Sequence, residues 1–390
     1  MRLFSRVPDT KNEQLSGTTG SLNDQKLIIS EIYRYIGAPR AVIHAGTRRI
    51  VLSPTRYQNN FLRKITYHNW MLYSLDNFNN PIRLPFEGGN NLDQISFNDR
   101  GNKMVSAIRS QLRRNSSISI YFAKLSMLIY DIETNKHYYK HMNTTSQAGA
   151  HGGKKAAFSH GTNLVAVSDY EQIVYVARVD KILEDKEGEP VFSTLDENTF
   201  LYSHGLSWAP NDELLAHVYY EHKKGSPVTG IISIWKLDGK GWKLNPRHLK
   251  NIKFEVQKDE NIFSDIGLAF SPDSRLIAVG GDTDIEMVKL FDIESGKLLC
   301  KSPNIPSRIP KIQFTPDGKY MITGGKDGIL RIWEVQDMNN SYALSILISH
   351  DFKGEILDFD LSKSYHELIL AYIQGKEIVI TDIKIPYGFN

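Results

Sequence analysis

Two histidines are the first residues whose type and spacing suggest chemistry. His137 and His141 in "KHYYKH" have the i, i+4 spacing of a zinc-binding pair on a helix. The local pattern, however, predicts a strand and turn, and on a strand residues four apart are separated by roughly 13 Å. That distance is too long for one ion to bridge, so we predict no metal site at this pair.

Glycine-rich and serine-containing motifs also lack the spacing that their chemistry requires. "GAHGGKKAAF" is similar to a phosphate-binding loop, but the position of its first glycine is Ala148, and no Ser or Thr follows the lysine. "SHG" occurs at 159–161 and 203–205 without the flanking glycines of a hydrolase nucleophile turn. Asp282 and Asp284 fit a structural turn. We therefore predict no catalytic residue, no cofactor and no small-molecule substrate.

A basic stretch is the strongest candidate for binding. Residues 36–114 contain twelve Lys or Arg and four Asp or Glu, a local excess of +8. "RYQNNFLRK" and "RSQLRRNSSISIYF" each fall between two predicted strands and are expected to extend hairpins, as is "YYEHKKGSPVTG". Such hairpins suit a protein partner, RNA or an anionic lipid, whereas a merely solvated surface is the alternative. The candidate partner-binding residues are Arg56, Tyr57, Phe61, Arg63, Arg113, Arg114, Tyr220, His222 and Lys223.

The composition describes an ordinary globular chain. Its 390 residues are 41% hydrophobic and 23% charged, and the net charge of +3 is too small to demand nucleic acid or a membrane as partner. One cysteine, Cys300, excludes an intramolecular disulfide and favours a reducing compartment, here taken as cytoplasmic. No apolar run reaches the roughly 20 residues that span a bilayer. Residues 1–25 are polar and are expected to form a disordered leader.

An internal repeat explains most of the remaining sequence. "FSPDSRLIAVGG" begins at Phe270 and "FTPDGKYMITGG" at Phe314, and weaker copies recur at intervals of 44 to 62 residues. Within a copy, an apolar strand ends in a turn of Pro, Asp or Gly, and three further short strands follow. Such a unit cannot bury both faces alone, but units packed radially can. The seven copies are anchored at Ile43, Phe97, Phe158, Trp208, Phe270, Phe314 and Phe359.

The copies at 270 and 314 resemble WD-repeat β-propellers, and the weaker copies extend that resemblance over most of residues 30–387. The resemblance implies an all-β, seven-bladed propeller of four-stranded antiparallel blades. In the family, a blade often holds a hydrogen-bonded set of Asp, Ser or Thr, His and Trp. The sixth unit supplies Thr323, Asp327 and Trp333 but has Ile305 at the His position; the seventh has His350 but Thr381 in place of Trp.

The chain ends in a third-strand pattern that lacks its fourth strand. "KLIISEIYRYI" (26–36) is apolar enough to supply it, so we predict that an N-terminal strand completes the last blade and closes the propeller. Residues 26–390 are then expected to form one domain.

These expectations favour a non-catalytic scaffold for protein–protein interaction, within a multiprotein complex. Two alternatives stay open. Propellers also host enzymes, including hydrolases, with acids and histidines around a central channel. The basic stretch could instead bind RNA or anionic lipid.

Overall fold

The structure is a computed structural model. The residues that it describes are 4–6, 13–15, 27–36, 40–52, 56–59, 64–67, 70–84, 95–111, 123–141, 155–161, 164–168, 174–183, 200–222, 228–238, 245–256, 266–281, 288–303, 305, 307–338, 341–362 and 367–385.

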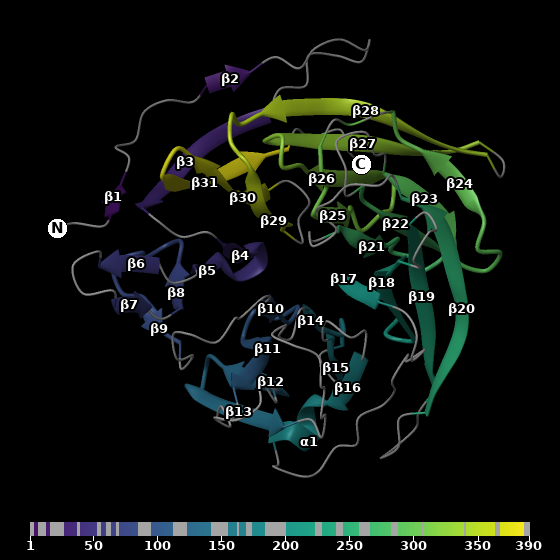
Figure 1. The fold of residues 1–390 in the computed structure, drawn as a ribbon. Helices are drawn as coiled ribbons and strands as arrows, with labels where there is room; N and C mark the ends of the chain where they lie inside the picture. Colours follow the sequence, from purple (N-terminus) through teal and green to yellow (C-terminus); the bar gives the residue numbers. More distant parts are fainter. Residues whose placement is uncertain are drawn as a thin grey trace. The chain divides into compact units, whose positions relative to one another are not determined.

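Antiparallel sheets, one for each repeated unit, make up the fold, which is that of a seven-bladed β-propeller (Figure 1). This confirms the predicted fold class. Blade one contains β4 (Ala41–His44), β5 (Arg49–Leu52), β8 (Met71–Ser74) and β9 (Ile82–Arg83), with the 3-10 turn η1 (Ala45–Thr47) after β4. Blade two contains β10 (Ile95–Phe97), β11 (Lys103–Gln111), β12 (Ala123–Asp131) and β13 (Lys136–His141). Blade three contains β14 (Lys155–Phe158), β15 (Leu164–Ser168) and β16 (Val174–Arg178), followed by the helix α1 (Val179–Leu183).

The remaining blades follow the same order. Blade four contains β17 (Phe200–Trp208), β18 (Leu214–His222), β19 (Thr229–Asp238) and β20 (Asn245–Glu255). Blade five contains β21 (Leu268–Phe270), β22 (Leu276–Val279), β23 (Lys289–Asp292) and β24 (Leu298–Lys301). Blade six contains β25 (Lys311–Phe314), β26 (Tyr320–Gly324), β27 (Ile329–Asp337) and β28 (Tyr342–Asp351). Blade seven contains β29 (Ile356–Leu361), β30 (Glu367–Gln374) and β31 (Glu377–Lys384).

The missing strand of blade seven comes from the N-terminal part of the chain, as predicted. β3 (Leu27–Ile36) pairs antiparallel with β31, from Ile28 opposite Lys384 to Ile36 opposite Glu377. Figure 1 shows the two strands side by side, purple against yellow. Two short strands inside the expected leader, β1 (Phe4–Arg6) and β2 (Glu13–Leu15), also pair with β3. The rest of residues 1–25 lies outside the described part, and the leader stays a prediction.

A shared turn joins the first two strands of most blades and explains the repeated "PD" text. In blade six, Thr315 N donates to the Tyr320 carbonyl at 2.9 Å and Gly318 N donates to Thr315 O at 2.8 Å. Gly318 has a φ of +73°, a conformation that glycine adopts without steric cost. Asp212 holds the equivalent position in blade four with a φ of +58°, which Asp tolerates better than most residues. The turn chemistry predicted from sequence is therefore the chemistry that sets the register.

The register also corrects one anchor. Phe314 pairs with Met321 and Trp208 with Leu215, each seven residues on. In blade seven the same spacing belongs to Leu361, which pairs with Leu368, whereas Phe359 pairs with Leu370. The predicted anchor was thus two residues early, because both side chains are buried on the same face of β29.

The chain divides into two compact units, each with its own apolar clusters. Unit one comprises 1–89, 279–290 and 299–390, and unit two comprises 90–278 and 291–298. In unit one, Leu27 of β3 is buried in a cluster with Val379 and Ile383 of β31. In unit two, Trp208 packs with Ala166, Val176 and Leu215. Within each unit, buried residues of different strands therefore pack into common apolar clusters.

Candidate functional site

The predicted hairpins are present between second and third strands. In blade one, β6 (Arg56–Asn59) and β7 (Lys64–Tyr67) pair as a separate hairpin inserted between β5 and β8. In blade two, the β11–β12 pairing continues from Lys103 opposite Asp131 to Gln111 opposite Ala123. In blade six, by contrast, β26 and β27 pair only from Tyr320 to Gly324. Blades one and two thus project extra hairpin where the basic stretch falls.

The described residues include four of the nine predicted partner-binding residues: Arg56, Tyr57, Tyr220 and His222. Arg56 and Tyr57 lie in β6, and His222 is the last residue of β18. Tyr220 is a correction: it is 1% exposed within β18 and so cannot serve as a surface anchor. The sequence "YYEH" continues the strand instead of starting the loop. Phe61, Arg63, Arg113, Arg114 and Lys223 lie outside the described residues.

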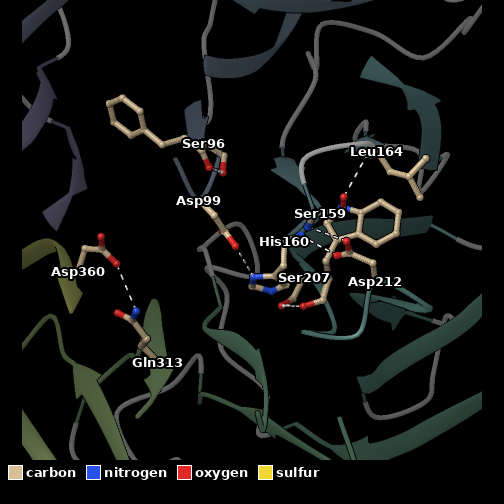
Figure 2. A network of polar contacts seen from close by, with 12 residues as sticks. Ser96, Asp99, Ser159, His160, Leu164, Ser207, Asp212, Gln313 and Asp360 are labelled. Atoms are coloured by element: carbon tan, nitrogen blue, oxygen red, sulfur yellow. Dashed lines mark hydrogen bonds and ion pairs between the residues drawn. The ribbon is translucent and has the colours of Figure 1, made fainter. Parts of the chain in front are cut away.

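His160 links three turns of unit two and was not predicted from sequence. Its Nδ1 lies 3.2 Å from Asp99 Oδ2 in the turn after β10. Its backbone N–H and that of Gly161 donate to the two carboxylate oxygens of Asp212, each at 2.6 Å. Figure 2 shows His160 between the two aspartates. One histidine in blade three is therefore bonded to turns of blades two and four.

Charge sets the protonation of His160. Burial disfavours the imidazolium, but the hydrogen bond and charge of Asp99 and the charge of Asp212 outweigh it, so the pKa of His160 is raised. The side chain is still 43% exposed, which limits the energy of the pair. Both carboxylates hold the turns in place, and the arrangement offers no unengaged base for proton abstraction.

A second polar cluster lies in unit one on the first strands of blades six, seven and one. Asp358 accepts from the backbone N–H of Ile43 at 2.8 Å and forms an ion pair with Lys311 at 2.9 Å. Asp360 accepts from the Ala45 N–H at 2.7 Å and from the Gln313 side chain at 3.2 Å, the latter drawn in Figure 2. The two carboxylates of β29 therefore bind N–H groups of β4 and η1 and side chains of β25.

Electrostatics in this cluster follow from burial and proximity. Desolvation opposes the charge of Lys311, but Asp358 and Asp360 raise its pKa. Burial, with repulsion from Asp358, raises the pKa of Asp360 despite the opposing charge of Lys311. Paired carboxylates beside a lysine are the residue types of acid–base catalysis. Here each oxygen is engaged with a backbone or side-chain donor, which fits a structural role.

The polar set of the repeat is partly formed in blade six. Trp333 Nε1 donates to Thr323 Oγ1 at 2.9 Å, and both residues are buried. Asp327 accepts from Arg331 at 2.7 Å, and its backbone N–H donates to Ser307 Oγ at 2.8 Å. Ile305, at the expected His position, is 2% exposed and apolar. A buried apolar side chain therefore occupies the expected His position, and Ser307 bonds the Asp327 backbone.

The histidine pair, the acidic turn and the cysteine considered in the sequence are the remaining predicted features. His137 and His141 lie on the strand β13, as expected, and Asp282 and Asp284 lie outside the described residues. Within the described part, no three His, Cys, Asp or Glu side chains are grouped to hold a metal ion. None of the described helices has the length and apolar character needed to cross a membrane. Burial raises the pKa of the Cys300 thiol to about 11, which disfavours the reactive thiolate.

Comparisons with known proteins agree with this geometry. The family model "WD domain, G-beta repeat" matches residues 306–334. Pre-mRNA-processing factor 19 of Oryza sativa subsp. japonica is 27% identical over 101 residues, 26% of this chain and 19% of that protein. Pre-rRNA-processing protein IPI3 of Saccharomyces cerevisiae (strain YJM789) is 31% identical over 109 residues, 27% of this chain and 18% of that protein. The matches thus span about a fifth of these relatives' lengths.

Solved structures extend the likeness to nearly the whole chain. The RRP9 WD40 repeats align with a TM-score of 0.61 at 13% identity, covering 96% of this chain and 100% of that one. A chain of the mitotic checkpoint complex aligns with a TM-score of 0.57 at 13% identity, covering 98% and 99%. At such identity the likeness concerns the fold. Residues 306–334 match the WD repeat, and the Trp333–Thr323 bond lies within that match, so the chain is similar to WD-repeat β-propellers in this repeat and in its fold.

Proposed function

We propose that this protein is a non-catalytic scaffold that binds protein partners through the hairpins between the second and third strands of blades one, two and four. The observation that carries the proposal is the lengthening of these hairpins relative to blade six; those of blades one and two lie in the arginine-rich stretch. Loops held on a rigid scaffold are frequent binding elements. Arginine and aromatic side chains are also frequent hot spots of protein interfaces.

The polar clusters support a binding function over a catalytic one. The carboxylates of Asp99, Asp212, Asp358 and Asp360 each accept hydrogen bonds from groups of the fold itself. Among the relatives, two carry names of RNA-processing factors and one solved chain belongs to a checkpoint complex. Membership in a multiprotein assembly is our proposal for this chain as well.

Charge reversal tests the proposal. The variant Arg113→Glu/Arg114→Glu is compared with Arg247→Glu/Lys253→Glu, two exposed basic residues of β20 that the proposal does not use. Tagged proteins are recovered from native cells with quantitative mass spectrometry. We expect the first variant to lose specific partners at least about tenfold and the second to keep them. Equal recovery of every partner by both variants would remove the hairpins as the binding surface.

RNA is tested in the same experiment. Recovered material is probed for nucleic acid, and binding of a labelled single-stranded RNA is measured at increasing salt. RNA affinity that persists at physiological salt, and is lost in Arg113→Glu/Arg114→Glu, would favour the nucleic-acid alternative over a protein partner.

A further inference from the structure

The outer strand of blade six, β28, is an edge strand of unusual composition. It is the last strand in the order β25-β26-β27-β28, and no strand within the described part of the chain pairs with its other side. Figure 1 shows it running along β27. Its sequence, "YALSILISHD", contains no Lys, Arg or Pro over ten residues. An edge strand exposes a row of backbone N–H and C=O groups that can pair with another chain.

Other outer strands of this protein carry devices that block such pairing. β20 contains Pro246 and exposes Arg247 and Lys253. β13 begins at the exposed Lys136. β9 has only two residues, Ile82–Arg83. Lysine, proline and shortness are the usual protections of a sheet edge. Their absence from β28 distinguishes this edge from β9, β13 and β20.

The regular part of the edge is Tyr342–Ile346. These residues pair in order with β27, from Asp337 opposite Tyr342 to Trp333 opposite Ile346, before a bulge shifts the register. Leu344 is 8% exposed and fixes the strand to the core. Ile346 is 44% exposed, and Met338, in the turn just before the strand, is 55% exposed. Apolar surface therefore lies at both ends of a straight five-residue edge.

The charges beside this edge are acidic. Two carboxylates of β27, Glu334 and Asp337, lie opposite residues of the Tyr342–Ile346 edge, whereas Asp351 lies at the far end of β28 in an ion pair with Lys353. Glu334, opposite Ser345, accepts hydrogen bonds from the neutral side chains of Gln336 and Ser345. Asp337 accepts from the Tyr342 hydroxyl at 3.2 Å. An added strand with Lys or Arg beside its apolar residues would complement this charge.

We infer that the Tyr342–Ile346 edge is a strand-addition site for an extended segment of a partner protein in which apolar residues alternate with Lys or Arg. Backbone hydrogen bonds to the edge would supply affinity. Contacts of alternate side chains with Ile346, Met338 and the acidic residues would supply specificity. The site uses none of the hairpin residues of blades one, two and four, so an experiment can contradict either proposal without contradicting the other.

The probe is a fluorescent ten-residue peptide in which Val and Ile alternate with Lys and Ser, measured by fluorescence anisotropy on the full chain. Its control is the same peptide N-methylated at alternate backbone nitrogens, which cannot pair with a strand edge. We expect the unmodified peptide to bind and the methylated peptide to bind at least about tenfold more weakly. Equal binding of the two peptides, or binding of neither, would overturn the inference.

Protein variants locate the site. Ile346→Lys places a cation on the edge, while Ile82→Lys makes the same change at a second exposed outer-strand isoleucine, 40% exposed in blade one. Unaltered thermal unfolding of each variant confirms folding. We expect Ile346→Lys to weaken peptide binding at least about tenfold and Ile82→Lys to leave it unchanged. Equal effects of the two variants would overturn the site. So would sedimentation showing a dimer that only Ile346→Lys dissociates, since the edge would then pair with a second copy.

Discussion

At the residue scale, a few buried polar side chains fix the blades where the family's usual set is incomplete. Of that set, blade six retains one buried bond between side chains, from Trp333 to Thr323. The indole is 0% exposed, so its N–H would have no access to water if the partner were removed. A buried donor without an acceptor costs more than the bond itself contributes.

We therefore predict that Thr323→Val destabilises the protein by about 1–3 kcal/mol, because it leaves the Trp333 N–H unsatisfied. Trp333→Phe removes that donor. The double variant Thr323→Val/Trp333→Phe should therefore lose less free energy of unfolding than the two single variants lose together. The free energy of unfolding from urea titration measures each step of this double-mutant cycle. Strict additivity would show that the bond contributes nothing.

His160 gives the second residue-scale prediction, and its sign follows from the raised pKa. A histidine whose pKa is higher folded than unfolded stabilises the fold fully below the unfolded value of about 6.5. That contribution is lost as pH rises through the folded pKa. Because the side chain is 43% exposed, the effect should stay below about 1 kcal/mol.

Nuclear magnetic resonance titration of the His160 ring checks this directly. We expect its midpoint above the ordinary histidine value, and Asp99→Asn should lower it by removing the first charge that raises it. A His160 midpoint unchanged by Asp99→Asn would exclude the ion pair.

At the element scale, the first strands of three blades of unit one are joined by side chains of β29. Asp358 is 6% exposed and binds both the Ile43 N–H and Lys311. We predict that Asp358→Ala costs about 2–4 kcal/mol, since it leaves a buried N–H and an unpaired lysine. Asp358→Asn, which keeps an acceptor, should cost less.

The matched control is Asp76→Ala. Asp76 also accepts from a cation, Arg48 at 2.8 Å, but its side chain is 66% exposed. An exposed pair contributes little, so we expect a change within about 0.5 kcal/mol in the same urea titration. Equal losses at Asp76 and Asp358 would contradict a special role for burial at β29.

Truncation tests the N-terminal strand as an element. Deleting residues 1–36 removes β3 and with it the buried Leu27 and the pairing with β31. We expect no cooperative thermal transition, because an open edge and an uncovered apolar face would remain in blade seven. Deleting only 1–25 keeps β3 and should preserve a transition. A cooperative melt of the 1–36 deletion equal to that of the full chain would contradict the prediction.

The elements were largely predictable from sequence, whereas the polar clusters were not. Turn residues and apolar alternation are local signals, so most first strands could be placed by their aromatic anchors. Blade seven was shifted because Phe359 and Leu361 are both apolar and two residues apart, and no Pro or Gly follows to mark the turn. His160 and its aspartates are 61 and 52 residues apart in sequence. No local sequence pattern predicts a hydrogen bond between turns of different blades.

Tyr220 illustrates a further limit of the sequence. It stands beside basic and flexible residues, which suggested a surface loop, yet the β18–β19 pairing extends past it. β18 is an inner strand of blade four, and all of residues 215–220 are buried, on both of its faces. Sequence composition around a residue therefore does not decide whether it lies in a loop or in a buried strand.

At the scale of the whole molecule, the two ends of the chain meet in one sheet. β3 and β31 are separated by nearly the whole sequence, and their pairing belongs to unit one, which the segment 90–278 of unit two interrupts. Contacts of such long range cost loop-closure entropy before they are formed. A covalent link between the two strands would remove much of that cost from the unfolded state.

We predict that Ile28→Cys/Lys384→Cys, in a Cys300→Ala background, forms a disulfide that stabilises the protein by about 3–5 kcal/mol. The two residues are register partners at one end of the β3–β31 pair, and the link would close a loop of about 350 residues. Urea unfolding of oxidised and reduced forms of the same protein isolates the effect. The control Ile28→Cys/Glu377→Cys, which joins the same β3 position to the β31 residue at the opposite end of the pair, should form poorly or destabilise. Stabilisation by the second link and not by the first would mean that the N-terminal strand completes blade seven in a different register.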